Sequence, residues 1–390
     1  MNTTIRRSLL ALAALAAAGA LSAADLKKVT IAHVGVSCEA PVFIAKEKGF
    51  FAEEGLDAEL LKGDWSFIKE SLAFGRIDAA QGLVMTYLKP IEQGLDAKFT
   101  AGVHRGCIHI LADKNSSIAT AADLKGKRIG VPAIGSSPWI FAARVVGQLG
   151  ADIKKDVEWK PFPAAELKLA LAKGEVDAIA VADPIGELLL TEGNVKSIVN
   201  QLTDAPFKDE YCCVVVVSGK LAKNDPDTAA RITRAILKAS LWVEKNPQSA
   251  AEISFNAKHI SANIELNSRV LTKLDYLPSV EGGRLAAATA AKALQEAGII
   301  EKTTDLAALV DRTFIRLPGL DDKWVKSLDV AQADTVTHEQ ILARKLRIGS
   351  WEVAVRTAKS CCSGDVQTVP TVAANDTLLD GAAASSRSAN

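Results

Sequence analysis

Two short stretches of the sequence could each build a binding turn: CEAPVFIA at residues 38–45 and GSSPWIFA at residues 135–142. In each, small or polar residues precede a proline, Pro41 or Pro138, and an apolar helical pattern follows. Proline suits the first turn of a helix, where backbone N–H groups have no partner within the helix and can receive an anionic or hydrogen-bond-accepting group. Ordinary helix capping would explain one such turn, but two in matched positions favour a shared ligand.

The two turns belong to a unit that occurs twice in the chain. Pro41 and Pro138 are 97 residues apart, and a second signature, G-x-[IV]-D-A, occurs at residues 75–79 and again at residues 174–178, 99 residues apart. Two intervals of nearly equal length indicate one duplicated unit and therefore a protein with two lobes.

Each copy of the unit predicts the order β-α-β-α-β, which is typical of α/β folds with doubly wound, mostly parallel sheets. The predicted elements are strand 27–35, helix 41–49, strand 56–61, helix 67–74 and strand 77–80, then strand 128–132, helix 138–150, strand 157–162, helix 164–173 and strand 176–181. In such sheets, ligands lie beyond the carboxyl ends of the strands. Both proline turns stand at that place, so two lobes facing each other across a hinge would enclose a ligand from both sides.

The connections between the copies predict the domain boundaries. Two runs of β-forming residues, 107–113 and 211–218, stand where the chain would cross between the lobes, and residues 226–345 are mostly helical in pattern. We predict a signal peptide at 1–24, a first lobe at 25–106 plus 215–345, a second lobe at 107–214 and a disordered tail at 346–390.

The N-terminal residues predict export to the periplasm. Arg6 and Arg7 precede an apolar run at residues 8–23, and small residues at 22–24 suit cleavage. The run is short for a membrane span, which favours a cleaved signal peptide over an anchor. The 46 basic and 46 acidic residues give a formal net charge of zero, so no basic surface for nucleic acid is expected.

The cysteines and histidines form a second constellation. Cysteines stand at positions 38, 107, 212, 213, 361 and 362, and His104 and His109 flank Cys107. Thiolate and imidazole suit soft metal ions, which makes Cys38, His104, Cys107, Cys212 and Cys213 candidate ligands. A Cys38–Cys107 or Cys107–Cys212 disulfide and simple apolar burial are the alternatives. Neighbouring cysteines on a strand rarely bridge each other, because their side chains diverge, so a Cys212–Cys213 disulfide is not expected. We assign no metal or other cofactor from the sequence.

Four stretches of the chain carry a resemblance to a known class of proteins. They are PVFIAKEKGFFAEEGLDAEL (41–60), FGRIDAAQG (74–82), ATAADLKGKRIGVPAIGSSPWIF (119–141) and ALAKGEVDAIAVADP (170–184). Over residues 28–320 the chain resembles the solute-binding proteins of ABC importers in the nitrate, sulfonate and taurine class, which includes binders of thiamine-pyrimidine precursors. The resemblance implies a type II periplasmic binding-protein fold with two hinge crossings, a central cleft, and delivery of a solute to a membrane permease.

The resemblance also implies which loops hold the solute. The candidate solute-binding residues are Ser37, Cys38, Glu39, Asp64, Trp65, Ser66, Gln81, Gly82, Gly135, Ser136, Ser137, Trp139 and Asp183. Three of them are acidic, and the two tryptophans could stack on a planar ring. This set favours a zwitterion, an amine or a polar heterocycle over a bare anion.

These observations predict a monomeric periplasmic protein that closes on one small polar solute and passes it to an ABC permease. The alternative is a periplasmic metal-binding or sensor-input protein that uses the cysteines and histidines near the hinge. The fungal thiamine-pyrimidine synthase shares the fold class, but this chain has only the pair Cys212–Cys213 where that family has a longer cysteine cluster. No nucleophile elbow, phosphate loop or HExxH motif is present, so an enzyme is not expected.

Overall fold

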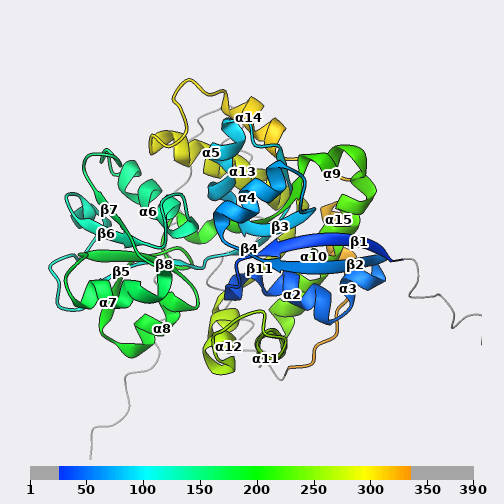
Figure 1. Ribbon diagram of the computed structural model, residues 1–390, viewed down its shortest axis with the longest axis horizontal. Coiled ribbons are helices and arrows are strands. Elements are labelled where there is room, and N and C mark those ends of the chain that lie inside the picture. The colour runs from blue at the N-terminus through cyan, green and yellow to red at the C-terminus, as the bar shows by residue number, and fades with distance from the viewer. Residues whose placement is uncertain (1–25, 335–390) are drawn as a thin grey trace, which may run out of the picture.

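The computed structural model describes residues 26–334 and places the strands in two sheets, one in each of two lobes (Figure 1). The first sheet has the order β11-β4-β10-β3-β1-β2, and the second has the order β7-β6-β8-β5-β9. The strands are β1 (Lys27–His33), β2 (Leu56–Lys62), β3 (Ala79–Leu83), β4 (Ala97–Arg105), β5 (Ile108–Asp113), β6 (Arg128–Val131), β7 (Glu158–Pro161), β8 (Ala178–Ala182), β9 (Val195–Asn200), β10 (Tyr211–Ser218) and β11 (Asp275–Ser279).

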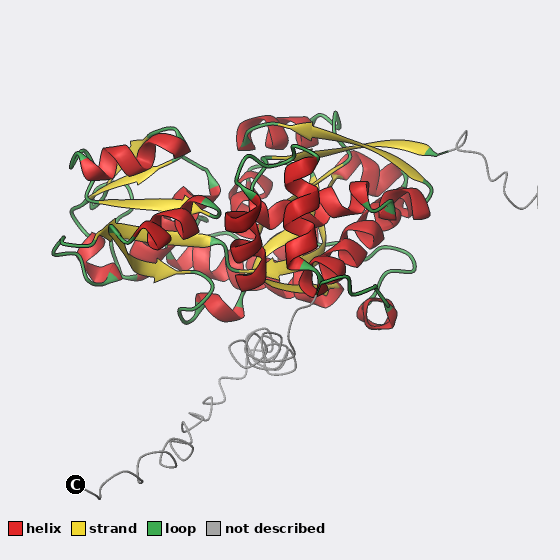
Figure 2. Cartoon of the chain, turned by 90° about the horizontal axis from the view of Figure 1, so that it is seen from below, coloured by secondary structure: helices red, strands yellow, loops and turns green. Residues whose placement is uncertain are grey.

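Helices cover the sheets in both lobes (Figure 2). The α-helices are α2 (Ala40–Glu47), α3 (Phe50–Glu53), α4 (Trp65–Ala73), α5 (Val84–Glu92), α6 (Ser137–Gln148), α7 (Leu167–Ala172), α8 (Ile185–Glu192), α9 (Gly219–Asn224), α10 (Pro226–Lys245), α11 (Pro247–Asn256), α12 (Ile264–Lys273), α13 (Val280–Glu296), α14 (Leu306–Thr313) and α15 (Asp322–Ser327). Short 3-10 helices are η1 (Ser37–Glu39), η2 (Ala121–Leu124), η3 (Ala164–Glu166) and η4 (Phe207–Asp209). Between residues 26 and 334, no helix is long and apolar enough to cross a membrane.

The duplicated unit is confirmed by the strand pairing. β1 pairs in parallel with β2 and β3, and β6 pairs in parallel with β7 and β8, so each lobe contains the same three-stranded arrangement. The repeated signature has the same structural role in both copies. The Asp78 carboxylate accepts the backbone N–H of Thr30 on β1, and the Asp177 carboxylate accepts that of Arg128 on β6, each at 2.8 Å. The aspartates thus fasten neighbouring parallel strands and are not ligand-binding groups.

The chain crosses between the lobes twice. The first crossing joins β4 to β5 through Gly106 and Cys107, and the second joins β9 to β10 through residues 201–210. β10 lies entirely in the first sheet, where it is antiparallel to β3 and β4. The second crossing therefore ends before Tyr211, earlier than the predicted lobe boundary at residue 214.

Several predicted elements differ from the structure. The predicted strand 107–113 begins at Ile108, because Cys107 has a φ of 125° that an extended strand does not allow. β4, β9 and helix α5 were absent from the prediction, and the region predicted as mostly helical contains strand β11. The predicted signal peptide, the tail, Cys361 and Cys362 lie outside the described residues.

The apolar core runs through the contact between the lobes. The apolar residues that recur at helical spacing on α10, Ile232, Ala235, Ile236, Ala239 and Val243, are all buried, and α10 packs on α2, α3 and β11 of the first lobe. On α6, the apolar face belongs to the same continuous cluster as the first lobe. A Cβ at Gly147 of α6 would lie 2.7 Å from the Ala297 carbonyl oxygen at the end of α13, so only glycine allows this close approach.

Candidate functional site

The predicted solute-binding residues all lie at or near the carboxyl ends of parallel strands, on loops of both lobes. The first lobe contributes η1, which follows β1, the start of α4, which follows β2, and Gln81 and Gly82 in β3. The second lobe contributes the start of α6, which follows β6, and Asp183, which follows β8. Ligands of open α/β sheets bind at this edge. The structure therefore places the predicted set at the edge where an α/β protein binds its ligand.

Two side-chain contacts join the lobes beside these loops. The Ser137 hydroxyl of α6 lies 3.2 Å from the Thr86 hydroxyl of α5, within hydrogen-bond distance and away from solvent. The Arg144 guanidinium, farther along α6, lies 3.7 Å from the Met85 sulfur. Gly135, which has a φ of 79°, faces Lys69 of α4, whose pKa is lowered by burial. The start of α6 thus contacts the first lobe directly.

An ion pair joins the lobes on the other side of the hinge. Glu187 of α8 is buried, and both of its carboxylate oxygens lie 2.7 Å from the Lys273 ammonium of α12. The Arg269 guanidinium, one turn earlier on α12, lies 3.8 Å from the same carboxylate. Because α8 belongs to the second lobe and α12 to the first, this ion pair stabilises the contact between the two lobes.

Glu39 satisfies the backbone of its own loop. Its buried carboxylate accepts the backbone N–H groups of Val34, Gly35 and Val36 at 2.8–3.1 Å. Burial, with the nearby Cys38 side chain, raises the pKa of Glu39 to about 8, against the effect of these three donors. The loop between β1 and η1 therefore uses its donors on an internal carboxyl group, and Glu39 is not free to bind a solute.

The other polar residues of the predicted set are also engaged by the protein. Asp64 caps α4 by accepting the Phe67 N–H at 2.8 Å. The Ser136 hydroxyl donates to the Ala133 carbonyl at 2.7 Å. Asp183 accepts the Glu187 N–H at 3.0 Å, and its carboxylate lies 3.1 Å from His109 Nε2. Burial lowers the pKa of His109, but the Asp183 carboxylate outweighs this effect and the pKa is raised. The acidic residues that favoured a zwitterion, an amine or a polar heterocycle over a bare anion thus each accept hydrogen bonds within the protein.

Trp65 is positioned by Gly82 and Tyr87. A Cβ at Gly82 would lie 2.7 Å from the Trp65 ring, so the ring lies directly on the backbone of β3. The Trp65 and Tyr87 rings meet edge to face at 6.2 Å. Trp139 on the second lobe packs edge to face with Trp159 at 5.8 Å. Both tryptophans are half-buried, which leaves part of each ring open to a ligand.

The buried polar atoms near the strand ends that have no hydrogen-bond partner within residues 26–334 include Ser37 Oγ, Gln81 Oε1, Tyr87 Oη and Trp139 Nε1. Buried polar atoms are rarely left without a partner, which makes such atoms candidates for ligand contact. Three of these residues belong to the predicted set. Tyr87 was missed because helix α5 was not recognised in the sequence QGLVMTYLKP, although this stretch directly follows the predicted binding residues Gln81 and Gly82.

The cysteine residues of the hinge meet in one buried group. Cys107 Sγ lies 3.3 Å from Cys212 Sγ, and Cys213 Sγ lies 3.8 Å from Cys212 Sγ. The side chains form two groups of potential metal ligands, Cys38, His104 and Cys213 in one and Cys107, Cys212 and Cys213 in the other. In each group the sulfur or ring-nitrogen atoms lie within 4.8 Å of one another. The four cysteines are free thiols. Contacts with the thiols of Cys107 and Cys213 lower the pKa of Cys38, whereas burial raises the pKa of Cys212 and Cys213.

No disulfide joins Cys212 and Cys213, although their sulfurs lie 3.8 Å apart. The pairing of β10 with β4 shifts register between Tyr211 and Cys213 and again before Val214. Such irregularities bend the strand and interrupt the alternation of side chains. His109 does not join the sulfur group on a common strand face, because Cys107 precedes β5, and it pairs with Asp183 instead.

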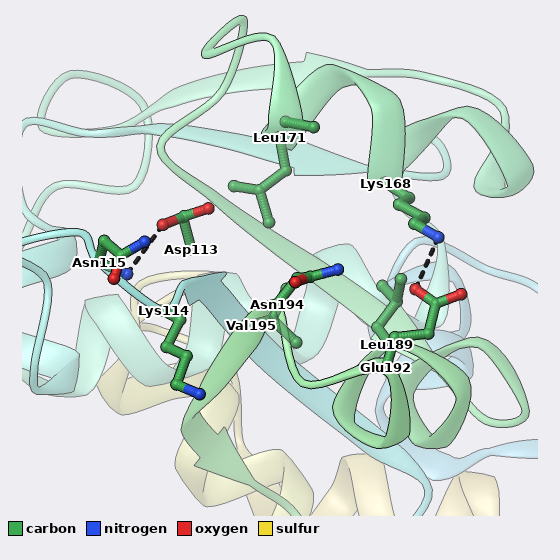
Figure 3. A pocket seen from close by; sticks show the side chains of 10 residues that line it. Asp113, Lys114, Asn115, Lys168, Leu171, Leu189, Glu192, Asn194 and Val195 are labelled. Atoms are coloured by element: carbon green, nitrogen blue, oxygen red, sulfur yellow. Dashed lines mark hydrogen bonds and ion pairs between the residues drawn. The ribbon is translucent and has the colours of Figure 1, made fainter.

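A pocket of about 280 Å³ on the second lobe lies apart from these loops. It is lined by the end of β5, α7, α8 and the start of β9 (Figure 3). Asp113 stands at the end of β5 remote from the hinge, and Lys168 is held by an ion pair with Glu192 at 2.6 Å. None of the predicted binding residues lines this pocket.

Comparisons with known proteins agree with this arrangement. The chain is 27% identical over 320 residues to a Bacillus subtilis protein named for binding aliphatic sulfonates, covering 77% of this chain and 92% of that protein. It is 24% identical over 277 residues to the nitrate/nitrite binding protein NrtA of Nostoc, covering 65% of this chain and 62% of that protein.

Among solved structures, the fold matches the periplasmic nitrate-binding protein NrtA of Synechocystis with a TM-score of 0.63 and 19% identity, covering 81% of this chain and 91% of that one. It also matches the alkanesulfonate-binding protein SsuA of Xanthomonas axonopodis, solved with MOPS bound, with a TM-score of 0.61 and 19% identity, covering 75% and 100%. The sequence pattern of the NMT1-like family matches residues 22–256, which is more than half of the chain. The chain therefore belongs to the NMT1-like family.

Proposed function

We propose that this protein is the solute-binding component of an ABC importer, which captures a small polar molecule between its lobes and delivers it to a membrane permease. The arrangement that carries the proposal is the pair of facing strand-end loops, joined across the hinge by the Ser137–Thr86 and Glu187–Lys273 contacts. Hinge closure around a ligand is the known device of periplasmic binding proteins. The relatives named above are binding proteins for small solutes, which supports the same function, a periplasmic location and the absence of an enzymatic activity.

The polar groups at the strand ends favour an uncharged, hydrogen-bonding solute. Glu39, Asp64 and Asp183 each accept backbone N–H groups of the protein, so these oxygens are already engaged. Among the buried groups without a partner there, Ser37 Oγ, Gln81 Oε1, Tyr87 Oη and Trp139 Nε1 are neutral and include both donors and acceptors. With the two half-buried tryptophan rings, this set suits a small polar heterocycle better than nitrate or a sulfonate.

The test is native mass spectrometry of the protein purified from periplasm without chelator, followed by titration calorimetry. A bound small molecule that leaves on unfolding supports the function and identifies the solute. Calorimetry then compares that solute with nitrate, bicarbonate, an alkanesulfonate and small polar heterocycles. Tight binding of a bare anion alone would contradict the proposed solute class, and the absence of any bound or titratable solute would contradict the function.

The double substitution Ser136→Ala with Ser137→Ala is expected to weaken solute binding by about 1–3 kcal/mol. Ser137 contributes the contact with Thr86 that joins the lobes, and Ser136 holds the turn that precedes α6. Calorimetry with the recovered solute measures the change, and Thr86→Ala should reproduce the Ser137 part of it. An unchanged affinity in the double variant would mean that the second turn only caps its helix.

Lys273→Met is expected to loosen the contact between the lobes, because it leaves the buried Glu187 carboxylate without its closest cation. We expect a larger radius of gyration by small-angle X-ray scattering and about 3- to 10-fold weaker solute binding. Lys46→Met is the matched control, since Lys46 pairs with Asp57 within the first lobe. If both variants scatter and bind as the unsubstituted protein does, the ion pair plays no part in closure.

A further inference from the structure

Four cysteines and one histidine form a compact group at the hinge, called here the hinge cluster: Cys38, His104, Cys107, Cys212 and Cys213. Its members come from η1, the end of β4, the first crossing and the start of β10. The register of β10 on β4 sets Cys213 opposite His104, and the Gln81 amide holds the Cys38 carbonyl at 2.7 Å. Residues separated by more than a hundred positions are thus brought together by the two crossings.

His104 is oriented as a metal-binding histidine would be. Its Nδ1 lies 3.2 Å from the Arg105 carbonyl, so the N–H is placed on Nδ1 and the lone pair on Nε2. Nε2 is buried and has no hydrogen-bond partner among the described residues, and a ring nitrogen of His104 lies within 4.8 Å of the Cys38 and Cys213 sulfurs. Histidines that bind metals commonly donate their other N–H to a backbone carbonyl in this way.

The donor set selects the class of metal. Thiolates and imidazole prefer zinc and other thiophilic ions, whereas calcium and magnesium need oxygen ligands, and no carboxylate belongs to either group of potential ligands in residues 26–334. All five side chains are buried. Burial disfavours net charge, and a divalent ion bound by two thiolates and neutral donors is neutral, whereas a monovalent ion with two thiolates is not.

We propose that Cys38, His104 and Cys213 bind a zinc-type divalent metal ion at the hinge. The Cys38 and Cys213 sulfurs and a ring nitrogen of His104 lie within 4.8 Å of one another, which supplies two sulfurs and one nitrogen of a tetrahedral site whose fourth position stays open. Cys212 touches Cys107 and Cys213 from outside this set. The ion would tie η1 to β4 and β10 and keep the two thiols that bind it reduced. The site is independent of the identity of the transported solute.

The experiment uses the mature protein carrying Cys361→Ser and Cys362→Ser, so that the only remaining thiols are those of the hinge cluster. The protein is reduced, freed of metal with a chelator and titrated with cobalt(II) and then zinc. We expect uptake of one cobalt ion per chain with thiolate-to-metal charge-transfer absorption and the visible bands of tetrahedral cobalt. Zinc should displace the cobalt and raise the melting temperature.

Cys38→Ala and Cys213→Ala are expected to lose metal uptake, and Cys212→Ala is the matched control that keeps it. Should either ligand variant fail to fold, the titration of the parent protein still decides the question. No uptake by the reduced parent would overturn the proposal, as would uptake of copper(I) without zinc. A Cys107–Cys212 disulfide in the isolated protein, with no metal uptake after its reduction, would also overturn it.

Discussion

Glu39→Ala is expected to lower the free energy of unfolding by about 3–5 kcal/mol, because it leaves three backbone N–H groups of a buried loop without an acceptor. Each unsatisfied buried donor costs about 1–3 kcal/mol. The loop formed by residues 34–36 relies on this single carboxyl group, since both of its oxygens are used. Urea unfolding monitored by circular dichroism measures the loss.

Glu39→Gln is the graded control. The glutamine keeps one accepting oxygen and nearly the same volume, so it should lose less than the alanine variant does. Asp64→Ala, which removes a single exposed cap on α4, should cost only about 1 kcal/mol. Equal stability of Glu39→Ala and the unsubstituted protein would show that water satisfies the loop and that the carboxyl group is dispensable.

Arg144→Met is expected to lower the free energy of unfolding by about 3–5 kcal/mol, the range observed when one partner of a buried ion pair is removed. Arg144 of α6 is 2% exposed, and its guanidinium binds the Glu210 carboxylate through two hydrogen bonds of 2.5 and 2.7 Å. The guanidinium also lies over the Phe207 ring at 5.0 Å. Glu210 and Phe207 belong to the second crossing, so the pair fastens this crossing to α6.

An exposed pair with the same chemistry provides the comparison. Arg128 and Asp177 also form a two-pronged pair, but their side chains are 38% and 30% exposed. Arg128→Met should therefore cost less than about 1 kcal/mol. A double-mutant cycle with Arg144→Met and Glu210→Gln separates the pair energy from the loss of packing. Similar losses at positions 128 and 144 would show that burial does not strengthen the Arg144 pair.

The sequence determined the parts of this protein that depend on local pattern. Both copies of the duplicated unit were predictable because each repeats a buried strand, a helix starting at a proline and a Gly-x-[IV]-Asp-Ala signature at nearly equal intervals. The stripe on α10 was predictable because a helix buries residues at a fixed period. β4 was not, because it contains charged and small residues and is a strand only through pairing with β10 and β11. Helix α5, which carries Pro90 within it, was missed as well.

The roles of the candidate site residues were decided by the tertiary structure. Sequence could place Glu39 and Asp183 in strand-end loops, but not show that their carboxylates face the protein's own N–H groups. It could not pair Ser137 with Thr86 or Glu187 with Lys273, since these contacts depend on how two lobes meet. The hinge cluster likewise needed the register of β10 on β4, because a shift of pairing redirects side chains without changing the sequence. Local pattern fixes elements, whereas contacts between distant segments are set by packing.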